Sequence, residues 1–286
     1  MKIAILLATY NSQIYLKEQL DSLLNQSYKK FTVYIRDDGS TDSTIEIVKS
    51  YCNRHSNFVL LDDFVLHRRS MGSFLWLLEH VTADYYMFCD HDDVWLPAKV
   101  EMSLKKMKDI EQPHRAALVC SDLVVVDSNL KVINNSFWDY MKLRPDLLTK
   151  KEYAMHCNIF TGCTMLINEE AKKLVYPVSE NAIIHDAWIA LRILANEGIV
   201  GCIKEPLILY RQHGGNVYGA HEVNIGWRFY ITKLFFVKRI IKGYVGYYRV
   251  ANDAFDNKLS KSRFIFYRMV YFIKKTLIRK ELYDFE

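Results

Sequence analysis

Three aspartates within four positions are the residues of this sequence best suited to chemistry. Asp90, Asp92 and Asp93, here termed the acidic cluster, directly follow the apolar run 85–89, which is typical of a buried strand in a parallel sheet. Open α/β sheets bind ligands at the carboxyl ends of such strands. Carboxylates this close repel one another unless a cation is present, and oxygen ligands suit Mg²⁺ or Mn²⁺ shared with a substrate phosphate. The cluster indicates either a metal site for a phosphorylated substrate or a solvated acidic turn before a helix.

A second acidic pair, Asp37 and Asp38, follows another expected strand at 31–35 and precedes a helix. The first expected strand, residues 3–8, ends at Thr9. Strands and helices that alternate at this spacing predict a right-handed parallel βαβ unit, so these residues should lie on the same rim as the acidic cluster. The pair can then accept hydrogen bonds from a nucleobase or a ribose hydroxyl. The alternative is that it only caps the following helix.

Two further places combine chemically useful side chains. His185 and Asp186 precede an apolar helical pattern and are expected at a helix N-terminus, where Asp186 either serves a reaction or simply caps the helix. Arg211 and His213 follow a short apolar strand expected at 207–210. A guanidinium suits a phosphate, and an imidazole suits a metal or a phosphate. A buried structural role is the alternative for Arg211.

Three motifs, each expected directly after a strand, carry a family resemblance. They are Ala-Thr-Tyr-Asn at 8–11, Asp-Asp-Gly-Ser-Thr-Asp at 37–42 and Asp-His-Asp-Asp at 90–93. In residue type, order and spacing they resemble the motifs of family 2 glycosyltransferases, over roughly residues 1–215. The resemblance implies an α/β protein with the GT-A nucleotide-sugar-binding fold, a mostly parallel sheet flanked by helices. It also implies an inverting enzyme that uses a nucleotide-diphosphate sugar.

The resemblance also implies roles for individual residues. The donor nucleotide is expected at Thr9, Tyr10, Asp37, Asp38, Asp90 and Arg211, and a divalent cation, Mg²⁺ or Mn²⁺, at Asp90, Asp92, Asp93 and His213. Asp186 stands where the family has its catalytic base, and His185 before it resembles the rhamnosyltransferase-like branch. On the acceptor side, His185 is expected to orient Asp186 or an acceptor hydroxyl. Trp188 is expected to stack on a sugar or to pack beneath the site.

In the expected reaction Asp186 removes a proton from an acceptor hydroxyl, which attacks the anomeric carbon opposite the nucleotide, while the metal stabilises the leaving group. The expected acceptor is a glycan or lipid-linked glycan in cell-surface polysaccharide synthesis. One rival is a sugar nucleotidyltransferase, which needs a Gly-rich phosphate loop where this chain has residues 8–11. Another is a glycosyltransferase-like binding subunit without activity, which the presence of both Asp92 and Asp186 disfavours.

Charge is unevenly distributed along the 286 residues. Residues 221–286 hold 14 Lys or Arg and 6 Asp or Glu, a net charge of +8, whereas residues 1–220 carry −3. We therefore expect a glycosyltransferase domain at 1–220 and a basic, aromatic helical extension at 221–286. Helical spacing at 225–241 and 264–278 is typical of a membrane-surface element, and a helical pair packed on the catalytic domain is the alternative. Nucleic-acid binding is not expected, because the acidic site fits a glycan enzyme better.

The sequence also bears on the compartment. Six cysteines without a CxxC pair lie in or beside apolar segments and are expected to be reduced thiols of a cytosolic protein. The first residues lead into a strand rather than a signal-peptide pattern, and no stretch reaches 18 uncharged apolar residues. These observations predict a cytoplasmic protein with peripheral contact at the inner face of the cell membrane.

Overall fold

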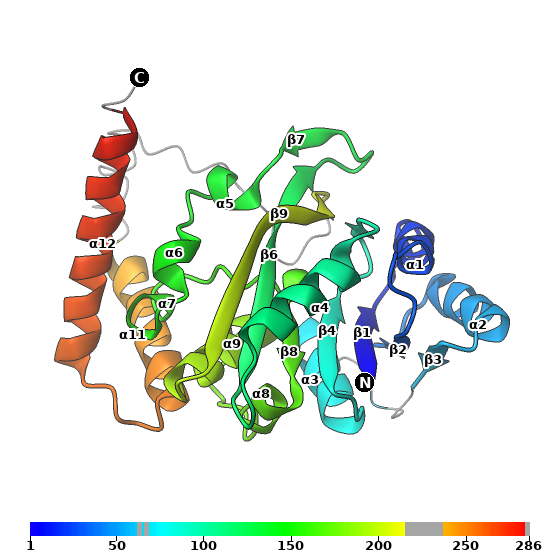
Figure 1. Cartoon of the computed structure of the whole chain (residues 1–286), viewed down its shortest axis with the longest axis horizontal. Coiled ribbons are helices and arrows are strands. Elements are labelled where there is room, and N and C mark those ends of the chain that lie inside the picture. The colour runs from blue at the N-terminus through cyan, green and yellow to red at the C-terminus, as the bar shows by residue number, and fades with distance from the viewer. Residues whose placement is uncertain (62–64, 66–68, 215–236, 284–286) are drawn as a thin grey trace.

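The computed structural model describes residues 1–61, 65, 69–214 and 237–283 (Figure 1). Its centre is one mixed sheet. The strands are β1 Ile3–Thr9, β2 Thr32–Asp37, β3 Phe58–Leu60, β4 Tyr85–Cys89, β5 Val94–Trp95, β6 Ala117–Val126, β7 Val132–Asn134, β8 Leu166–Asn168 and β9 Ile199–Arg211. Their order across the sheet is β3-β2-β1-β4-β8-β6-β9-β5, with β7 paired to β6.

Helices cover both faces of the sheet. They are α1 Leu16–Leu24, α2 Thr44–Arg54, α3 Arg69–His80, α4 Lys99–Ile110, α5 Phe137–Tyr140, α6 Pro145–Leu148, α7 Lys151–Ala154, α8 Glu169–Lys173, α9 His185–Ala195, α11 Val237–Ala254 and α12 Lys261–Tyr283, with a 3₁₀ turn, η1, at Gly162–Thr164. Figure 1 shows α4 on one side of the sheet and α3 and α9 on the other. Helix α4 packs through an apolar stripe that includes Val100, Leu104 and Met107.

The first half of the sheet is the predicted parallel βαβ unit. Side chains of a strand alternate between faces, so Ile5 and Leu7 of β1 enter the core under α1 and α4, while Leu6 enters the core under α3 and α9. Strand β1 pairs in parallel with β2 on one side and with β4 on the other. Because the carboxyl ends of these three strands meet at one edge, the polar motifs that follow them share one rim.

The second half of the sheet adds antiparallel strands to the expected α/β fold. Four strand pairs are parallel, and four, namely β4 with β8, β5 with β9, and β6 with β7 and β8, are antiparallel. Strand β9 runs beside β6 and places Arg211 opposite Val126. Its end also pairs with β5, where Val94 lies opposite Leu209. The residues after Asp93 are thereby fixed against the end of β9.

The C-terminal helices pack onto the body of the protein. Buried residues of α11 and α12, including Ala251, Phe264 and Tyr271, belong to the same hydrophobic cluster as α9. Helix α12 contains the helix expected at 264–278. The expected helix at 225–241 and the expected domain boundary at 220/221 lie mostly outside the described residues.

The helices and the cysteines bear on the expected compartment. Among these residues, none of the helices is both long enough and apolar enough to cross a membrane. All six cysteines are free thiols, as expected. Cys120 and Cys202 lie opposite each other on β6 and β9, with their Sγ atoms 3.5 Å apart.

Candidate active site

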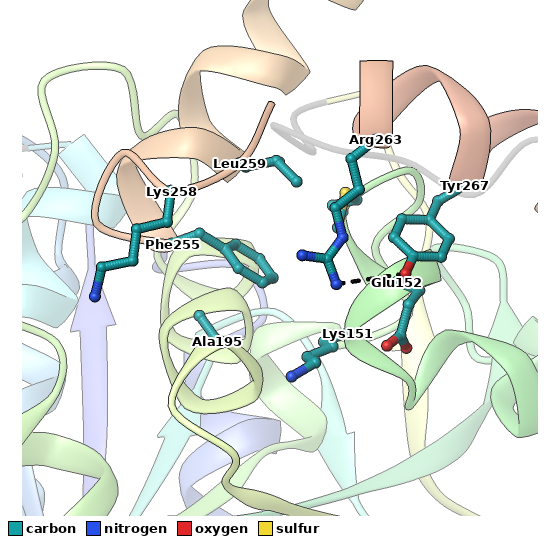
Figure 2. A pocket seen from close by; sticks show the side chains of 9 residues that line it. Lys151, Glu152, Ala195, Phe255, Lys258, Leu259, Arg263 and Tyr267 are labelled. Carbon is teal, nitrogen blue, oxygen red and sulfur yellow. Dashed lines mark hydrogen bonds between the residues drawn. The ribbon is translucent and has the colours of Figure 1, made fainter. Parts of the chain in front are cut away.

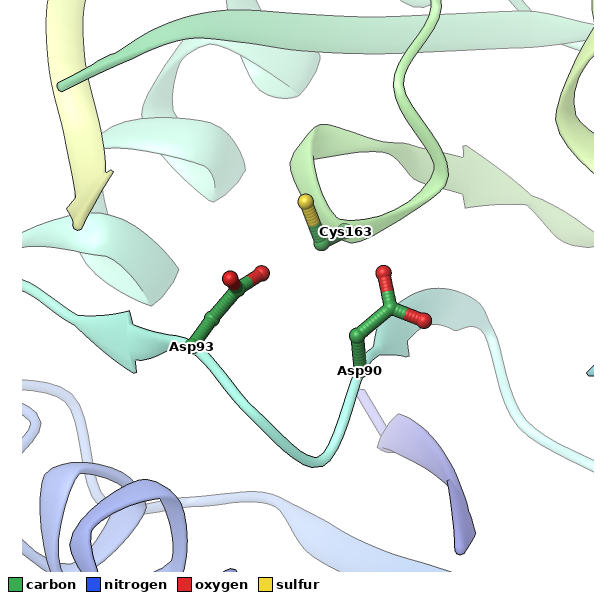
Figure 3. A group of neighbouring side chains, drawn as sticks. All are labelled: Asp90, Asp93 and Cys163. Carbon is green, nitrogen blue, oxygen red and sulfur yellow. The ribbon is translucent and has the colours of Figure 1, made fainter. Parts of the chain in front are cut away.

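The loop from β4 to β5 brings two carboxylates and a thiol together. Ligand atoms of Asp90, Asp93 and Cys163 lie within 4.8 Å of one another (Figure 3). Asp93 is fully buried, and its Oδ1 accepts the backbone N–H of Arg211 at 3.1 Å. Its Oδ2 is buried without a hydrogen-bond partner among the described residues. An ionised carboxylate oxygen that is buried without a hydrogen-bond donor is unfavourable in free energy. The position of Asp93 Oδ2 therefore favours a bound cation or a proton.

The electrostatics of the acidic cluster favour a cation. Burial, together with the charges of Asp92 and Asp186, raises the pKa of Asp90 to about 8, although part of the residue stays exposed. Burial and the charges of Asp92 and Asp90 likewise raise the pKa of Asp93 well above its usual range. A divalent cation would reverse these shifts. The carboxylates of Asp90 and Asp93 fit Mg²⁺ or Mn²⁺, which prefer oxygen, whereas Asp92 is not among the ligand atoms that lie within 4.8 Å of one another. Burial raises the pKa of the soft Cys163 thiol, so it does not suit these ions.

Asp92 contacts the end of β9. Its Oδ2 lies 2.9 Å from His213 Nε2, and the His213 ring packs on Tyr15 with ring centroids 4.8 Å apart. The structure thus joins His213 to the acidic cluster through a carboxylate oxygen of Asp92, while its role as a metal ligand stays a prediction. An imidazole in this position fixes the orientation of a carboxylate ligand.

Arg211 differs from its expected role at the donor phosphate. The residue is buried, its Nε donates to the Asp92 carbonyl at 2.8 Å, and its Nη1 donates to the Ser128 carbonyl at 2.7 Å. Its Nη2 pairs with Glu18, and the guanidinium lies over the Tyr15 ring. The side chain is therefore engaged in holding the acidic loop, which is the structural alternative left open by the sequence.

Asp186 lies in the first turn of α9, one residue after its start. Its Oδ2 accepts the N–H of Gly162 at 3.0 Å, and its Oδ1 accepts Nδ2 of Asn158 at 3.0 Å and the N–H of Ala187 at 2.5 Å. Burial raises its pKa to about 6 even though these hydrogen bonds lower it. The carboxyl is thus ionised at neutral pH, and it stays partly exposed. Its charge also raises the pKa of Asp90, so the two carboxyls lie in one site.

His185 is a core residue rather than an acceptor ligand. Its ring packs on Phe74 and Phe88, with centroids 4.4 Å and 5.2 Å away. Burial lowers its pKa to about 3, so the ring is neutral at physiological pH. Its Nε2 has no hydrogen-bond partner among the described residues. The ring therefore makes no described hydrogen bond to Asp186, which corrects the expectation that it orients this residue.

Trp188 packs beneath the site. Only 2% of the residue is exposed, and its Nε1 donates to the Val175 carbonyl at 2.8 Å. Stacking on a sugar requires an exposed ring face. The structure therefore corrects the stacking role and agrees with the packing alternative.

Asp37 closes the turn after β2. Its carboxylate accepts the Thr9 hydroxyl at 2.8 Å, the Ser40 N–H at 2.8 Å and the Gly39 N–H at 3.1 Å. Gly39 has a φ of 89°, a conformation that side chains disfavour. Tyr10, next to Thr9, is exposed on this rim. The turn places Thr9, Tyr10 and Asp37 together, while their contact with a nucleoside stays a prediction.

Asp38 has a different set of partners. It forms a buried ion pair with Arg36 at 2.8 Å and accepts the N–H of Arg69, the first residue of α3, at 2.8 Å. Arg36 also donates to the Ser73 hydroxyl. In α2, Asp42 accepts the N–H of the first residue. The capping alternative for the acidic pair is therefore wrong for α2, and Asp38 instead joins β2 to α3.

Four further residues belong to the site but had no role assigned from the sequence, namely Asn158, Gly162, Cys163 and Lys99. Lys99 is fully buried; its Nζ lies 3.4 Å from the Thr164 carbonyl and 4.4 Å from the centroid of the Trp95 ring. Burial lowers its pKa to about 8, even though neighbouring groups, Asp93 among them, partly offset this shift. It is therefore a buried cation next to the acidic cluster. The small-residue turn at 161–164 was the available signal for Gly162 and Cys163.

A separate cavity of about 110 Å³ lies away from these residues (Figure 2). Its lining includes Ala195, Phe255 and Arg263. Ala195 ends α9, whereas Asp186 is in the first turn of this 11-residue helix. The cavity is therefore not part of the acidic rim.

Comparison with known proteins agrees with this geometry. The family model "Glycosyl transferase family 2" matches residues 4–173. The dTDP-rhamnosyl transferase RfbG of Shigella flexneri is 25% identical over 232 residues, which cover 75% of this chain and 74% of RfbG. Matches to the first curated relatives span 44%, 66% and 74% of those proteins' own lengths.

Two solved structures show the same fold. Staphylococcus aureus TarS 1–349 in complex with UDP-GlcNAc has a TM-score of 0.57 and 18% identity, over 83% of this chain and 66% of TarS 1–349. The mannosyltransferase PcManGT of Pyrobaculum calidifontis, in complex with GDP-Man and Mn²⁺, has a TM-score of 0.52 and 19% identity. That match covers 77% of this chain and 58% of PcManGT.

Proposed function

The chain belongs to glycosyl transferase family 2 and has its GT-A fold, and from its site we propose an inverting transfer of a sugar from a nucleotide-diphosphate sugar to a hydroxyl group. One observation carries this proposal. The partly exposed carboxyl of Asp186, ionised at neutral pH, is bonded to Gly162, and the adjacent Cys163 lies beside Asp90 and Asp93. Asp186, which could deprotonate the acceptor, and the acidic cluster, which could hold a metal-bound diphosphate, therefore lie in one site.

The donor is proposed to lie along the rim formed by β1, β2 and β4. Its nucleoside would contact Thr9, Tyr10, Asp37 and Asp38, and its diphosphate would reach the acidic cluster. The register that sets Thr9 opposite Asp37 and Leu7 opposite Cys89 supports a continuous site. The complexes of TarS with UDP-GlcNAc and of PcManGT with GDP-Man support a nucleotide sugar, and the name of RfbG supports a deoxyhexose among the candidates.

The proposed cofactor is Mg²⁺ or Mn²⁺, held by Asp90, Asp92 and Asp93. When bound, it would neutralise charge on the leaving diphosphate. The raised pKa values of Asp90 and Asp93 support this assignment, because a cation offsets their repulsion. His213 would keep Asp92 oriented through their 2.9 Å contact, and Lys99 would balance the charge of the buried Asp93. The Mn²⁺ of the PcManGT complex supports a divalent ion.

Asp186 is proposed as the general base. Its hydrogen bonds to Asn158 and Gly162 hold the carboxylate in one orientation, and such preorganisation limits the cost of reaching the transition state. The hydroxyl that it deprotonates would attack the anomeric carbon on the face opposite the nucleotide, which inverts the configuration. We propose a glycan or lipid-linked glycan of cell-surface polysaccharide synthesis as the acceptor.

A donor panel tests the proposal. The full chain is incubated with nucleotide-diphosphate hexoses and deoxyhexoses in Mn²⁺, in Mg²⁺ or in EDTA, and the nucleoside diphosphate and sugar products are identified by mass spectrometry. We expect one donor to be consumed, slowly by hydrolysis without acceptor and only with a cation. No consumption of any donor, together with donor binding measured by calorimetry, would identify a binding subunit without activity.

A further inference from the structure

Two cysteine thiols contact each other between neighbouring strands of the sheet. Cys120 of β6 and Cys202 of β9 are opposite each other in the parallel register of these strands. Their Sγ atoms are 3.5 Å apart, and both side chains pack in the hydrophobic cluster that contains residues of α9. The proposed sugar transfer uses neither thiol, so the contact between them calls for a separate explanation.

The backbone geometry of this pair suits a disulfide bond. Neighbouring strands lie about 4.7–4.9 Å apart, and disulfides join residues whose Cα atoms are about 4.4–6.8 Å apart. A disulfide bond is about 2.05 Å long, so each sulfur has to move by only about 0.7 Å from the 3.5 Å contact. Rotation of the two side chains, with a small adjustment of the strands, provides this approach.

The neighbouring part of the sheet allows such an adjustment. The register of β6 and β9 shifts directly after Ser121, where β9 has the two extra residues Lys204 and Glu205. A bulge of this kind interrupts the ladder of hydrogen bonds and bends the strand locally. Because the bulge begins two residues after Cys202, a regular ladder holds this cysteine on one side only.

The two thiols differ in exposure and in acidity. Cys202 is partly exposed, whereas Cys120 is buried. The hydrogen bond with Cys120 lowers the pKa of Cys202, although burial opposes this effect. The same hydrogen bond, together with burial, raises the pKa of Cys120 well above its usual range. Because the thiolate is the reactive form of a cysteine, Cys202 is the thiol that reacts first with an oxidant, and Cys120 lies next to it as a second thiol.

We propose that Cys120 and Cys202 form a peroxide-sensitive dithiol that closes to an intramolecular disulfide. In the first step the Cys202 thiolate attacks one oxygen of hydrogen peroxide and the O–O bond breaks. This gives a sulfenic acid and a hydroxide, which takes up the proton that the thiol has lost and becomes water. In the second step the Cys120 sulfur attacks the sulfenic sulfur, and the sulfenic hydroxyl leaves with the Cys120 proton as a second water.

The overall reaction oxidises two thiols and reduces one peroxide to two waters. A thiol reductant reverses it by exchange with the new disulfide. The bond would join two residues that are 82 positions apart in the chain. This modification is independent of the proposed sugar transfer, because neither thiol has a role in that reaction.

The test follows the thiols of the full chain. The reduced protein is freed of reductant, treated with a small molar excess of hydrogen peroxide, and denatured in N-ethylmaleimide, which blocks the remaining thiols. The blocked thiols are counted from the intact mass, and tryptic peptides are mapped with and without dithiothreitol. Trypsin releases Cys120 in residues 116–131 and Cys202 in residues 193–204, so the disulfide appears as a cross-link between these two peptides.

Three variants separate the roles of the thiols. Cys202→Ser removes the thiol that reacts first, and Cys120→Ala removes its partner. The matched control is Cys52→Ser, because Cys52 is also partly exposed but lies on α2, where burial raises its pKa. Circular dichroism melting verifies folding, and dimedone traps any sulfenic acid. The peptide map of the wild type decides the proposal even if a substitution prevents folding.

We expect peroxide to consume two of the six free thiols of the wild type, as a cross-link of Cys120 with Cys202 that dithiothreitol releases. Cys52→Ser should also lose two thiols, whereas Cys202→Ser should lose none. Cys120→Ala should give a dimedone adduct at Cys202 without a cross-link. Six thiols that stay reduced in the wild type would overturn the proposal. So would a cross-link between other cysteines or between two chains, or oxidation of Cys202 without a bond to Cys120.

Discussion

The carboxylate of Asp186 accepts the backbone N–H of Gly162 at 3.0 Å. The residue after Gly162 is Cys163, whose thiol lies beside Asp90 and Asp93. One hydrogen bond therefore links the proposed base to the proposed metal site. A Cβ at position 162 would lie 2.6 Å from Nε2 of the buried His185 ring, so this close approach requires glycine.

Gly162→Ala should disturb both functions at once. The His185 ring is packed against Phe74 and Phe88, so the added methyl must displace the turn or the ring. Overpacking of this kind typically costs about 1–3 kcal/mol. We expect a loss of that size in the free energy of unfolding in urea, and a fall in turnover of more than about tenfold, because a small displacement of catalytic groups is costly.

The matched control is Gly246→Ala in α11, where a new Cβ would meet nothing within 4 Å. It should leave turnover unchanged and stabilise the helix by up to about 1 kcal/mol. If Gly162→Ala behaved like this control, the contact between Gly162 and Asp186 would have no role in the site.

The activity should depend on the pKa of Asp186. Burial raises this pKa to about 6, and a general base must be ionised. Above pH 6 the carboxylate form of Asp186 predominates. Its titration should therefore cause no change in kcat/KM at higher pH. Below pH 6 it should fall about tenfold per pH unit. His185 contributes no such change near neutrality, because burial lowers its pKa to about 3.

This pH profile has to be separated from cation binding. The pH profile of kcat/KM is therefore recorded at increasing Mn²⁺ concentrations. The fall in kcat/KM that is due to Asp186 should persist when the cation site is saturated. A profile that remains flat down to pH 5 at saturating Mn²⁺ would show that Asp186 is not the base.

Cation binding should release protons. Burial raises the pKa of Asp90 to about 8, so at pH 7 the cation-free cluster retains a proton that a cation displaces. The affinity for Mn²⁺ should therefore rise with pH between about 6 and 8. Calorimetry in two buffers with different ionisation enthalpies measures the released protons. Equal heats in both buffers would contradict this description of the cluster.

Asp92→Asn should abolish the cation-dependent turnover while the protein stays folded. The carboxylate of Asp92 is partly exposed and contacts His213 at 2.9 Å, so the substitution removes a ligand charge without opening the core. Titration of Mn²⁺ and a thermal melt distinguish the two effects. Turnover close to that of wild type, or activity independent of any cation, would rule out the metal assignment.

Asp38→Asn tests whether the second acid of the pair has a structural role. Its partner Arg36 is buried, and breaking a buried pair from one side typically costs about 3–5 kcal/mol. The control is Asp146→Asn, which breaks the more exposed pair with Arg144, also at 2.8 Å, and should cost less than about 1 kcal/mol. Urea unfolding measures both variants. Equal losses would mean that the Arg36 pair adds little to stability.

The parallel half of the fold could be predicted because its strands are short apolar runs followed at once by polar motifs. β1, β2 and β4 end within two residues of their expected ends. Strand β9 was expected only at 207–210 but runs Ile199–Arg211. Lys204 and Glu205 are exposed and lie at a register shift against β6, so they interrupt the apolar pattern without ending the strand.

The site could be predicted only in part, for a related reason. The acids at the strand ends were visible because polar residues interrupt apolar runs there. The burial of His185 depends on Phe74 and Phe88, more than 90 positions away in the chain, and no local pattern reports such a contact. Asn158 follows helices of only four residues, α5 to α7, which are too short to produce a helical period.

The most direct test of the proposed function is the Asp186→Asn variant. It keeps the size of the side chain and removes its basicity, and general-base assistance is typically worth about 10²–10⁴-fold. The control is Glu170→Gln in the first turn of α8, where the acid pairs with Lys173 on the surface. Turnover with donor and acceptor is compared with donor affinity measured by calorimetry. We predict that Asp186→Asn loses about 10²–10⁴-fold in turnover with donor affinity unchanged, and that the control loses neither. A loss of less than about tenfold, or a loss of donor binding instead, would contradict the assignment of Asp186 as the base.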